Sequence, residues 1–484
     1  MRSDLAFAPA TELLRLMESR EVSSREILEL QLERIARFNP TVNAIIYLDV
    51  DAARARADAA DADRARGKIW GKLHGLPMTV KDVHNVAGWP TTYGDPANRD
   101  WRPERNAAVI DRLIGAGAII FGKTNVPFNS ADFQSFNAIH GTTHNPWAHG
   151  RTPGGSSGGA AAALAAGLSP VEFGSDIAGS IRFPSHFCGV YGHKPTHGIV
   201  TAEHNLRRGA WLDNDLLTSG PMARSVEDLA LLMDVVAGPG GPAAKAWSLD
   251  LPAARATQLP DFRVALIEDS AVAPIDAPYR ARIREFAGLL RGAGANIAAD
   301  TFPAFDQREA HETFIRLLRG SAAASLPESV YDTAVQISEG LAKTDMSYKA
   351  QLRRAQAQRH RDYIFAEQNR MRIKQAWAEF FEKFDILLAP VTLSSAFPLD
   401  EQTVREERTL NVNGRLVDYN DQMFWAGYST LPSLPVTSIP IGFDANGLPV
   451  GLQVIGPYLE DRTTLAFAAA ASAIQSFVAP PGFS

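Results

Sequence analysis

The sequence has a single cysteine, Cys188, among its 484 residues. A disulfide needs two cysteines, so a scaffold held by intramolecular disulfides is excluded. Scarce cysteine is typical of proteins from a reducing compartment, and we expect a cytoplasmic protein. We interpret Cys188 as a small buried hydrophobe, and the alternative is a papain-type catalytic thiol.

Long apolar runs and an excess of basic residues are also missing. No uninterrupted apolar run reaches about 18 residues, the length expected of a membrane-spanning helix. The opening residues MRSDLAFAPATELL contain no apolar region of the signal-peptide type. The net charge of −6 is mild, whereas nucleic-acid binders usually carry a strong basic excess. We therefore expect neither a membrane nor a nucleic acid as a partner.

What the sequence does contain is an ordinary globular composition, with 45% hydrophobic and 21% charged residues. Short apolar strands alternate with helical patterns in residues 76–81, 109–113, 118–122 and 264–266. This alternation predicts the α/β class, with a mixed, mostly parallel central sheet covered by helices on both faces. No internal repeat or long linker divides the chain, so we expect one domain over residues 1–484.

Three local signals refine this outline. Ser23 followed by Glu26 has capping-box spacing, which predicts that a helix begins there. The dipeptide Asn413-Gly414 predicts a hairpin. Residues 270–380 are mostly helical in pattern, and we expect this segment to face the substrate.

Residues 151–182 form the densest motif of the chain. Two glycine–serine clusters, residues 154–159 and 174–180, flank an alanine-rich run that predicts a compact helix. Glycines beside a serine let the backbone approach a substrate closely. Ser156 and Ser180 lie 24 residues apart (180 − 156), and a compact helix between them can bring them to one point.

Lys81 follows a short apolar strand and supplies a candidate base. A serine hydroxyl needs a base to act as a nucleophile at neutral pH. A lysine can serve when burial keeps it neutral, because loss of solvation disfavours the charged form. A second serine can pass the proton from the nucleophile to the lysine, and the backbone amides of residues 177–180 can stabilise an oxyanion.

His140 and His144 lie four residues apart, which is the spacing of a metal-binding pair. No acidic residue follows at the spacing of a zinc protease, and the surrounding pattern is that of a loop rather than a helix. We therefore interpret both as loop histidines and predict no metal site.

Together these motifs resemble the amidase signature family of serine hydrolases. The matching segments are residues 75–82, 122–125, 153–159, 174–182, 188–195 and 219–222. Their order and spacing match the family over most of the chain, most densely over residues 70–240, the signature catalytic core. The resemblance implies the amidase-signature fold and hydrolysis of a carbon–nitrogen amide bond.

The resemblance also implies a role for each residue of the site. Ser180 is the nucleophile that becomes acylated, Ser156, in a cis peptide bond, relays its proton, and Lys81 is the general base. Asp176 and Arg182 brace the nucleophile loop through an ion pair. The implied mechanism needs no metal and no organic cofactor.

The implied oxyanion and substrate contacts involve the backbone. The amides of Ile177, Ala178 and Gly179 form the oxyanion loop, and Ser130 lies in the segment that runs along the acyl site. Most family members have a glycine where this chain has Ala178. If that position needs a positive φ, the oxyanion loop is reshaped; if it does not, the change is neutral.

The implied substrate is a small or medium amide, such as an anilide, a linear or cyclic amide, or a carbamate, with water as the second reactant. Two alternatives stay open. One is the glutamine-hydrolysing A subunit of a transfer-RNA amidotransferase, to which the sequence shows no clear match outside the shared core. The other is a non-catalytic binding member of the family. The assembly is also open, with a homodimer as one option.

Overall fold

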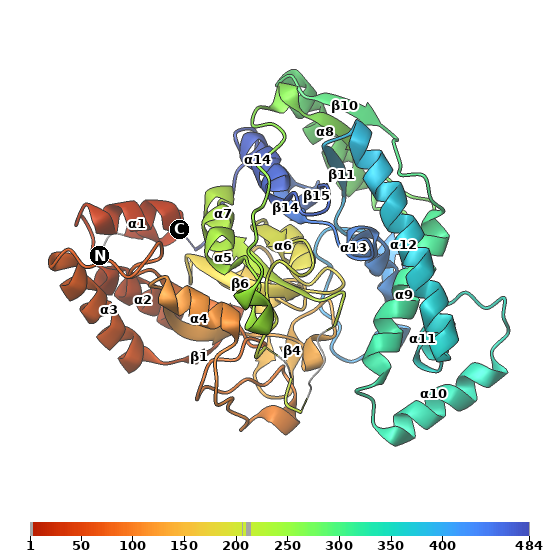
Figure 1. Ribbon diagram of the computed structural model, residues 1–484, viewed down its shortest axis with the longest axis horizontal. Helices are drawn as coiled ribbons and strands as arrows, with labels where there is room; N and C mark the ends of the chain where they lie inside the picture. Colours follow the sequence, from red (N-terminus) through yellow and green to blue (C-terminus); the bar gives the residue numbers. More distant parts are fainter. Residues whose placement is uncertain (1–2, 206, 210–213, 484) are drawn as a thin grey trace.

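The computed structural model describes residues 3–205, 207–209 and 214–483, which form a large and a small central β-sheet surrounded by helices (Figure 1). The strands of the larger sheet follow the order β10 (Asn296–Ala299), β9 (Arg263–Leu266), β11 (Ile386–Pro390), β15 (Pro449–Ile455), β14 (Val436–Phe443), β7 (Tyr191–Lys194), β8 (Thr218–Ala223) and β6 (Val171–Asp176). Those of the smaller sheet follow the order β1 (Ile45–Leu48), β3 (Ile119–Thr124) and β2 (Pro77–Lys81).

The larger sheet confirms the mixed α/β class predicted from the sequence, with fewer parallel pairs than expected. Parallel pairing joins β9 to β10 and to β11. From β11 through β15, β14, β7 and β8 to β6, each neighbouring pair is antiparallel. Hydrophobic patterning identifies strands, but their order and direction depend on tertiary packing, which the pattern does not encode.

Helices cover both faces of the larger sheet. On one face α7 (Val226–Val236) packs on β8, α14 (Asp461–Ser472) packs on β14, and the two helices contact each other. On the other face α5 (Gly158–Ala165) packs against α6 (Arg182–Cys188). Neighbouring residues of a strand point to opposite faces, and in β8 Met222 belongs to the α5–α6 cluster whereas Ala223 packs with α7.

Helix α5 is the compact helix that the alanine-rich run predicts. Its sequence is GGAAAALA, and every one of its residues is buried. Because its side chains are small, it can contact β2 and β3 of the smaller sheet as well as β6 and β8 of the larger one. The helix therefore places the end of β2 beside the glycine–serine clusters.

The segment 270–380 lies at the top and on the right of Figure 1, away from the N-terminal helices on the left. It contains α8 (Ala277–Gly292), α9 (Gln307–Ala323), α10 (Glu328–Gly340), α11 (Tyr348–Gln356), most of α12 (His360–Lys383), and the edge strand β10. The N-terminal helices are α1 (Ala10–Glu18), α2 (Ser24–Val42) and α3 (Val50–Ala65).

Two local predictions are confirmed. Helix α2 begins with a capping box, in which the Ser23 side chain accepts from the Glu26 amide and the Glu26 carboxylate accepts from the Ser23 amide. The Asn413-Gly414 turn joins β12 (Thr409–Val412) to β13 (Arg415–Asp418) in an antiparallel hairpin. The remaining regular elements are α4 (Ala108–Gly115), α13 (Met423–Thr430), β4 (Phe136–Asn137) and β5 (Gly141–Thr142).

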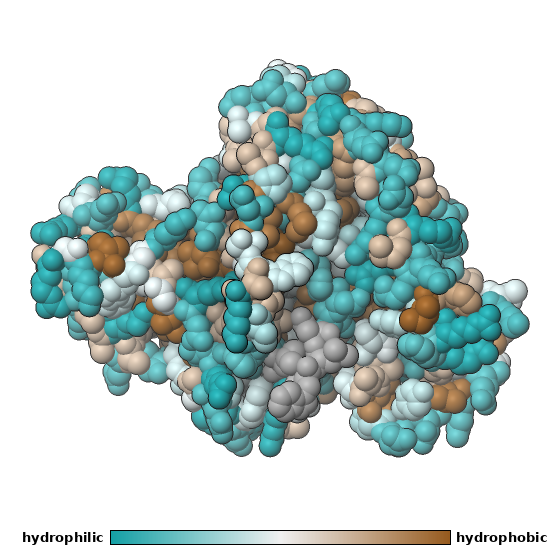
Figure 2. Space-filling model, in the orientation of Figure 1, coloured by the Kyte–Doolittle hydropathy of each residue, from teal (hydrophilic) through white to brown (hydrophobic). Residues whose placement is uncertain are grey.

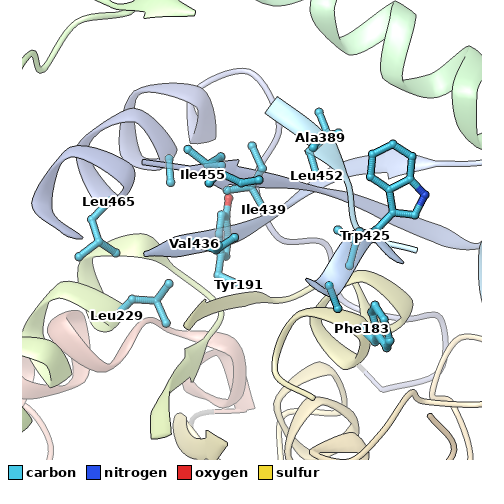
Figure 3. Packing of buried hydrophobic residues seen from close by; sticks show 14 of the residues in the cluster. Phe183, Tyr191, Leu229, Ala389, Trp425, Val436, Ile439, Leu452, Ile455 and Leu465 are labelled. Carbon is cyan, nitrogen blue, oxygen red and sulfur yellow. The ribbon is translucent and has the colours of Figure 1, made fainter. Parts of the chain in front are cut away.

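The hydrophobic core lies between the larger sheet and its helices. Figure 3 shows Tyr191, Val436 and Leu465 packed on one side of this core, with Trp425 and Phe183 on the other. On the face shown in Figure 2, hydrophobic side chains form scattered patches among hydrophilic ones. Within the described residues, no helix combines the length and the apolar character needed to cross a membrane.

Candidate active site

Lys81 is the last residue of β2, a strand whose residues are all buried. The side chain is 0% exposed, and its Nζ lies 2.7 Å from Ser156 Oγ and 3.0 Å from Ser175 Oγ. Within the part of the chain that the structure describes, no carboxylate forms an ion pair with it. The amine of Lys81 is therefore surrounded by neutral hydroxyl groups rather than by a counterion.

This environment lowers the pKa of Lys81 to about 7. Burial is the main cause, because removing water disfavours the ammonium form. The negative charge of Asp176 opposes the shift, the positive charge of Arg207 adds to it, and Glu172 opposes it when ionised. A neutral Lys81 amine is thus available at neutral and mildly alkaline pH.

Ser156 sits in a tight turn before α5, and the peptide bond between Gly155 and Ser156 is cis. A Cβ on Gly155 would lie 2.3 Å from the carbonyl oxygen of Asp132, so only glycine fits against that stretch of backbone. Gly154 has a φ of +88°. The glycines of this cluster thus let the Ser156 turn press against residues 132–134.

Ser180 lies in the loop that joins β6 to α6 and is 6% exposed. Its carbonyl oxygen accepts a hydrogen bond of 3.0 Å from the amide of Ser157. The turn that carries Ser156 and the loop that carries Ser180 are therefore bonded directly through their backbones. The structure thus places the Lys81 amine against Ser156 and the Ser156 turn against the backbone of the Ser180 loop.

Asp176 and Arg182 form a buried ion pair, with Arg182 Nη2 2.8 Å from Asp176 Oδ1 and both side chains 0% exposed. The Asp176 carboxylate also accepts the amides of Gly179 at 2.8 Å and Ile181 at 3.0 Å. Burial alone would raise the pKa of Asp176, but the charge and hydrogen bonds of Arg182 hold it well below its usual range. The carboxylate therefore stays ionised and fixes the backbone on both sides of Ser180.

Arg182 extends this support to the C-terminal part of the chain. Its Nη1 donates to the carbonyl of Ala426, to Ser429 Oγ and to Gln453 Oε1. Its Nη2 donates to Thr430 Oγ1 at 2.8 Å. The nucleophile loop is thereby anchored to α13 and β15 as well as to β6.

The predicted oxyanion loop, residues 177–179, makes a hydrogen bond to Asp176 through one of its amides. The amide of Gly179 donates to Asp176 Oδ1, so this amide is already used within the loop. Gly179 has a φ of +100°, whereas the φ of Ala178 is not positive. The loop therefore places its left-handed residue at Gly179, and alanine at position 178 meets no backbone conflict.

Ser130 lies in a turn beside the Ser156 cluster. Its φ is +53°, and its Oγ is buried with no hydrogen-bond partner among the described residues. Phe133, three residues further on, packs edge-to-face on Phe183 with ring centroids 5.0 Å apart. The segment that holds Ser130 thus contacts the helix that follows the nucleophile.

Sequence reasoning missed two polar residues of β6. Ser175 contacts Lys81 Nζ through its hydroxyl, and the residue lies one position before Asp176. Glu172 is 0% exposed, and its Oε1 accepts a hydrogen bond from the hydroxyl of Thr79. Burial raises the pKa of Glu172 to about 8. The sequence feature that could have pointed to Glu172 is its place in the apolar run Val171-Glu172-Phe173, since strands that are buried on both faces rarely contain charged residues.

His140 and His144 do not belong to a metal cluster in the described residues, where no group of three or more His, Cys, Asp or Glu side chains has metal-binding geometry. The ring of His144 stacks on that of His149, with centroids 3.8 Å apart.

Cys188 is fully buried at the end of α6, where burial raises the pKa of its thiol, so a papain-type thiolate is not formed there.

Comparison with known proteins adds a family match that spans most of the chain. Residues 26–465 match the family model described as Amidase. The chain is 33% identical to the A subunit of a glutamyl-tRNA(Gln) amidotransferase from Acidothermus cellulolyticus, covering 95% of this chain and 92% of the relative. It is 31% identical to an acylamidase of Rhodococcus erythropolis, covering 98% and 96%.

Solved structures agree with this match. A bacterial aryl acylamidase of the amidase signature family superimposes with a TM-score of 0.82 at 26% identity, covering 97% of this chain and 96% of its own. A 6-aminohexanoate cyclic dimer hydrolase superimposes with a TM-score of 0.80 at 26% identity, covering 99% of each chain. The likeness to the amidotransferase relative extends far beyond the catalytic core, so the expectation that it ends there is wrong.

Proposed function

The chain belongs to the amidase family, as its motifs predict, and on that premise we propose that it hydrolyses a small or medium amide through an acyl-enzyme on Ser180. The single observation that carries the proposal is the contact between Lys81 Nζ and Ser156 Oγ in an interior where no described carboxylate pairs with the amine. A buried amine with a pKa of about 7 can accept a proton at physiological pH.

In the first half of the reaction, the Ser180 hydroxyl attacks the carbonyl carbon of the amide. The proton of Ser180 passes to Ser156, and the proton of Ser156 passes to the neutral amine of Lys81. The carbonyl oxygen becomes an oxyanion, which the amides of Ile177 and Ala178 stabilise, since the amide of Gly179 serves Asp176.

The tetrahedral intermediate then loses its amine. The carbon–nitrogen bond breaks, and the leaving nitrogen receives the proton that Lys81 holds, by way of Ser156. A water molecule attacks the Ser180 ester and gives its proton through Ser156 to Lys81. The ester bond then breaks to release the acid, and the proton returns from Lys81 through Ser156 to the oxygen of Ser180. The products are one carboxylic acid and one amine, and the three side chains return to their starting protonation states.

We place the substrate among anilides, linear or cyclic amides and carbamates. Two proteins of similar structure support this choice: one is named an aryl acylamidase, and the other is named a 6-aminohexanoate cyclic dimer hydrolase.

We also propose a single amidase domain over residues 1–484, with the catalytic core at 70–240 and a helical segment at 270–380 facing the substrate. The supporting observation is that α9 and α13 contact each other beside the site.

The second candidate function is glutamine hydrolysis as the A subunit of a transfer-RNA amidotransferase. It is favoured by the 33% identity to such a protein, which is close to the 31% identity to an acylamidase. A hydrolysis screen separates the two, using anilides, aliphatic amides, carbamates, esters and glutamine with the wild type and with Ser180→Ala. Anilide or aliphatic amide turnover that Ser180→Ala loses supports the first function, and glutamine turnover alone supports the second.

A further inference from the structure

The turn that holds Ser130 lies directly beside the catalytic serines. The carbonyl of Asp132 occupies the space where a Cβ of Gly155 would be. The Phe133 ring packs on Phe183, and the Phe183 ring lies where a Cβ of Gly179 would be. Residues 129–133 therefore border both the Ser156 turn and the Ser180 loop.

Two arginines from distant segments hold the backbone of this turn. Arg207 Nη2 donates to the carbonyl of Asn129 at 2.5 Å, and its Nη1 donates to Asn129 Oδ1 at 3.3 Å. Arg405 Nη1 donates to the carbonyl of Ala131, and its guanidinium lies 4.5 Å from the centroid of the Phe133 ring. Arg207 thus binds the carbonyl of the residue before Ser130, and Arg405 binds the carbonyl of the residue after it.

A third arginine joins Arg405 from the helical segment. Arg319 on α9 has its Nη2 3.6 Å from Met423 Sδ, and Arg405 Nη2 lies 3.9 Å from the same sulfur. The Nε of Arg319 is buried and has no hydrogen-bond partner among the described residues. Figure 1 shows α9 and α13, which begins at Met423, together on the right of the catalytic core.

These three cations lack counterions in the described part of the chain. None of Arg207, Arg319 and Arg405 forms an ion pair with a described carboxylate. The carboxylate of Asp132, which lies in this turn, forms an ion pair with Arg408, whose Nη1 lies 2.5 Å from Asp132 Oδ2. The local positive charge therefore exceeds the negative charge beside the nucleophile.

Electrostatic effects on the neighbouring groups agree with this excess. Burial lowers the pKa of Arg319, and the charge of Arg405 lowers it further, while Tyr348 and Glu406 oppose the shift. The positive charge of Arg207 contributes to lowering the pKa of Lys81, which burial lowers most. Guanidinium groups that are held together without a counterion are costly, and an anion placed among them removes that cost.

We propose that Arg207, Arg319 and Arg405 form a subsite for a carboxylate of the substrate, so that the enzyme prefers amides that carry an anionic group. The guanidinium fork matches a carboxylate in two parallel hydrogen bonds, and the free hydroxyl of Ser130 adds one more donor. The inference rests on the proposed function, because a subsite at this place serves a nucleophile at Ser180.

The test uses two matched fluorophosphonate probes, one with an alkyl chain that ends in a carboxylate and one with the methyl ester of that chain. The rate of adduct formation on Ser180 is measured by mass spectrometry of the whole protein. We expect the carboxylate probe to react roughly tenfold faster or more, the size of a charge-assisted contact. The preference should fall as salt is added, since the site is open to solvent at Arg207.

Variants assign the preference to the arginines. Arg405→Gln and Arg319→Gln should each bring the ratio of the two rates towards one, and Arg207→Gln should do the same. Arg316→Gln, on the exposed side of α9 one turn before Arg319, and Arg208→Gln, next to Arg207, are matched controls that should keep the ratio. A ratio of rates cancels any loss of folded protein.

Each outcome decides the proposal. Labelling of Ser180 by both probes at equal rates, or faster by the ester, overturns the subsite and leaves the nucleophile in place. A carboxylate preference that survives all three arginine variants overturns its assignment to these residues. Absence of any adduct on Ser180 from either probe overturns the proposed function, and the subsite with it.

Discussion

The side-chain nitrogen of Lys81 lies 2.7 Å from the hydroxyl oxygen of Ser156, and both side chains are almost completely buried. An ammonium group in that position would be shielded from bulk solvent, and none of the described carboxylates would pair with it. The protein therefore stabilises the neutral amine, which is the form that can take a proton from a serine. The hydroxyl of Ser175, 3.0 Å from the same nitrogen, fixes its direction.

The pH dependence of catalysis should follow the titration of Lys81. Its pKa is lowered to about 7, so the amine is protonated and inactive below pH 7 and neutral and active above it. We expect kcat/KM to rise about tenfold per pH unit below pH 7 and to level off above it. A rate that peaks in acid would contradict the assignment of Lys81 as the base.

The ion pair of Asp176 and Arg182 should contribute strongly to stability. Asp176→Asn leaves the Arg182 charge buried without a partner, and we expect the free energy of unfolding to fall by about 3–5 kcal/mol. The measurement is the midpoint of urea denaturation. Asp58→Asn is the matched control, because Asp58 pairs with Arg25 on the exposed surface, where water screens the charges.

Equal midpoints for Asp176→Asn and Asp58→Asn would show that the buried pair does not hold the loop. The activity of Asp176→Asn should fall together with its stability, because the same carboxylate fixes the amides of Gly179 and Ile181.

The oxyanion loop should tolerate a change at residue 178 and resist one at residue 179. Ala178→Gly alters a residue whose φ is not positive, so we expect kcat within a few-fold of the wild type. Gly179→Ala introduces a Cβ 2.6 Å from the Phe183 ring at a φ of +100°, and we expect a loss of at least 10²-fold. Steady-state kinetics on one amide compares the two. Equal rates for the two variants would contradict the requirement for glycine at position 179.

Glu172 should make stability depend on pH in a defined window. Its pKa is raised from 4.5 to about 8 in the folded protein, mainly by burial, so folding retains a proton that the unfolded chain loses. Between about pH 4.5 and 8 the wild type should therefore lose stability relative to Glu172→Gln, by up to about 1.4 kcal/mol per pH unit. Above pH 8 the difference should stay constant.

Thermal or urea unfolding at several pH values measures this difference, with Glu18→Gln on the exposed surface of α1 as the control. A difference between wild type and Glu172→Gln that does not change with pH would mean that the Glu172 carboxyl does not stay protonated on folding.

Features that depend on neighbouring residues in the sequence were predictable. The capping box of α2 and the hairpin at Asn413-Gly414 follow from local hydrogen bonding and turn chemistry. The glycine–serine clusters and Lys81 carry the catalytic assignment because each motif is short and continuous. The alanine-rich helix between the clusters was equally local.

Features that depend on tertiary packing were not predictable. Arg207, Arg319 and Arg405 are more than 80 residues from one another in the chain, and each looks like a surface charge in its own segment. Arg207 and Arg405 contact the turn of Ser130 only in the folded chain, and Arg319 meets Arg405 at Met423 through the packing of α9 on α13. The strand directions, such as the antiparallel pairing of β6 with β8, also depend on contacts between segments that are distant in the sequence.

The central claim is that Ser180 becomes acylated with help from Ser156 and Lys81, and an adduct map tests it most directly. The folded protein is treated with a fluorophosphonate, digested, and mapped by mass spectrometry. We predict one adduct on Ser180 in the wild type, none in Ser180→Ala, and formation slowed by orders of magnitude in Ser156→Ala and Lys81→Ala. An unmodified Ser180 in the folded wild type, or labelling of Lys81→Ala at the wild-type rate, would contradict the account.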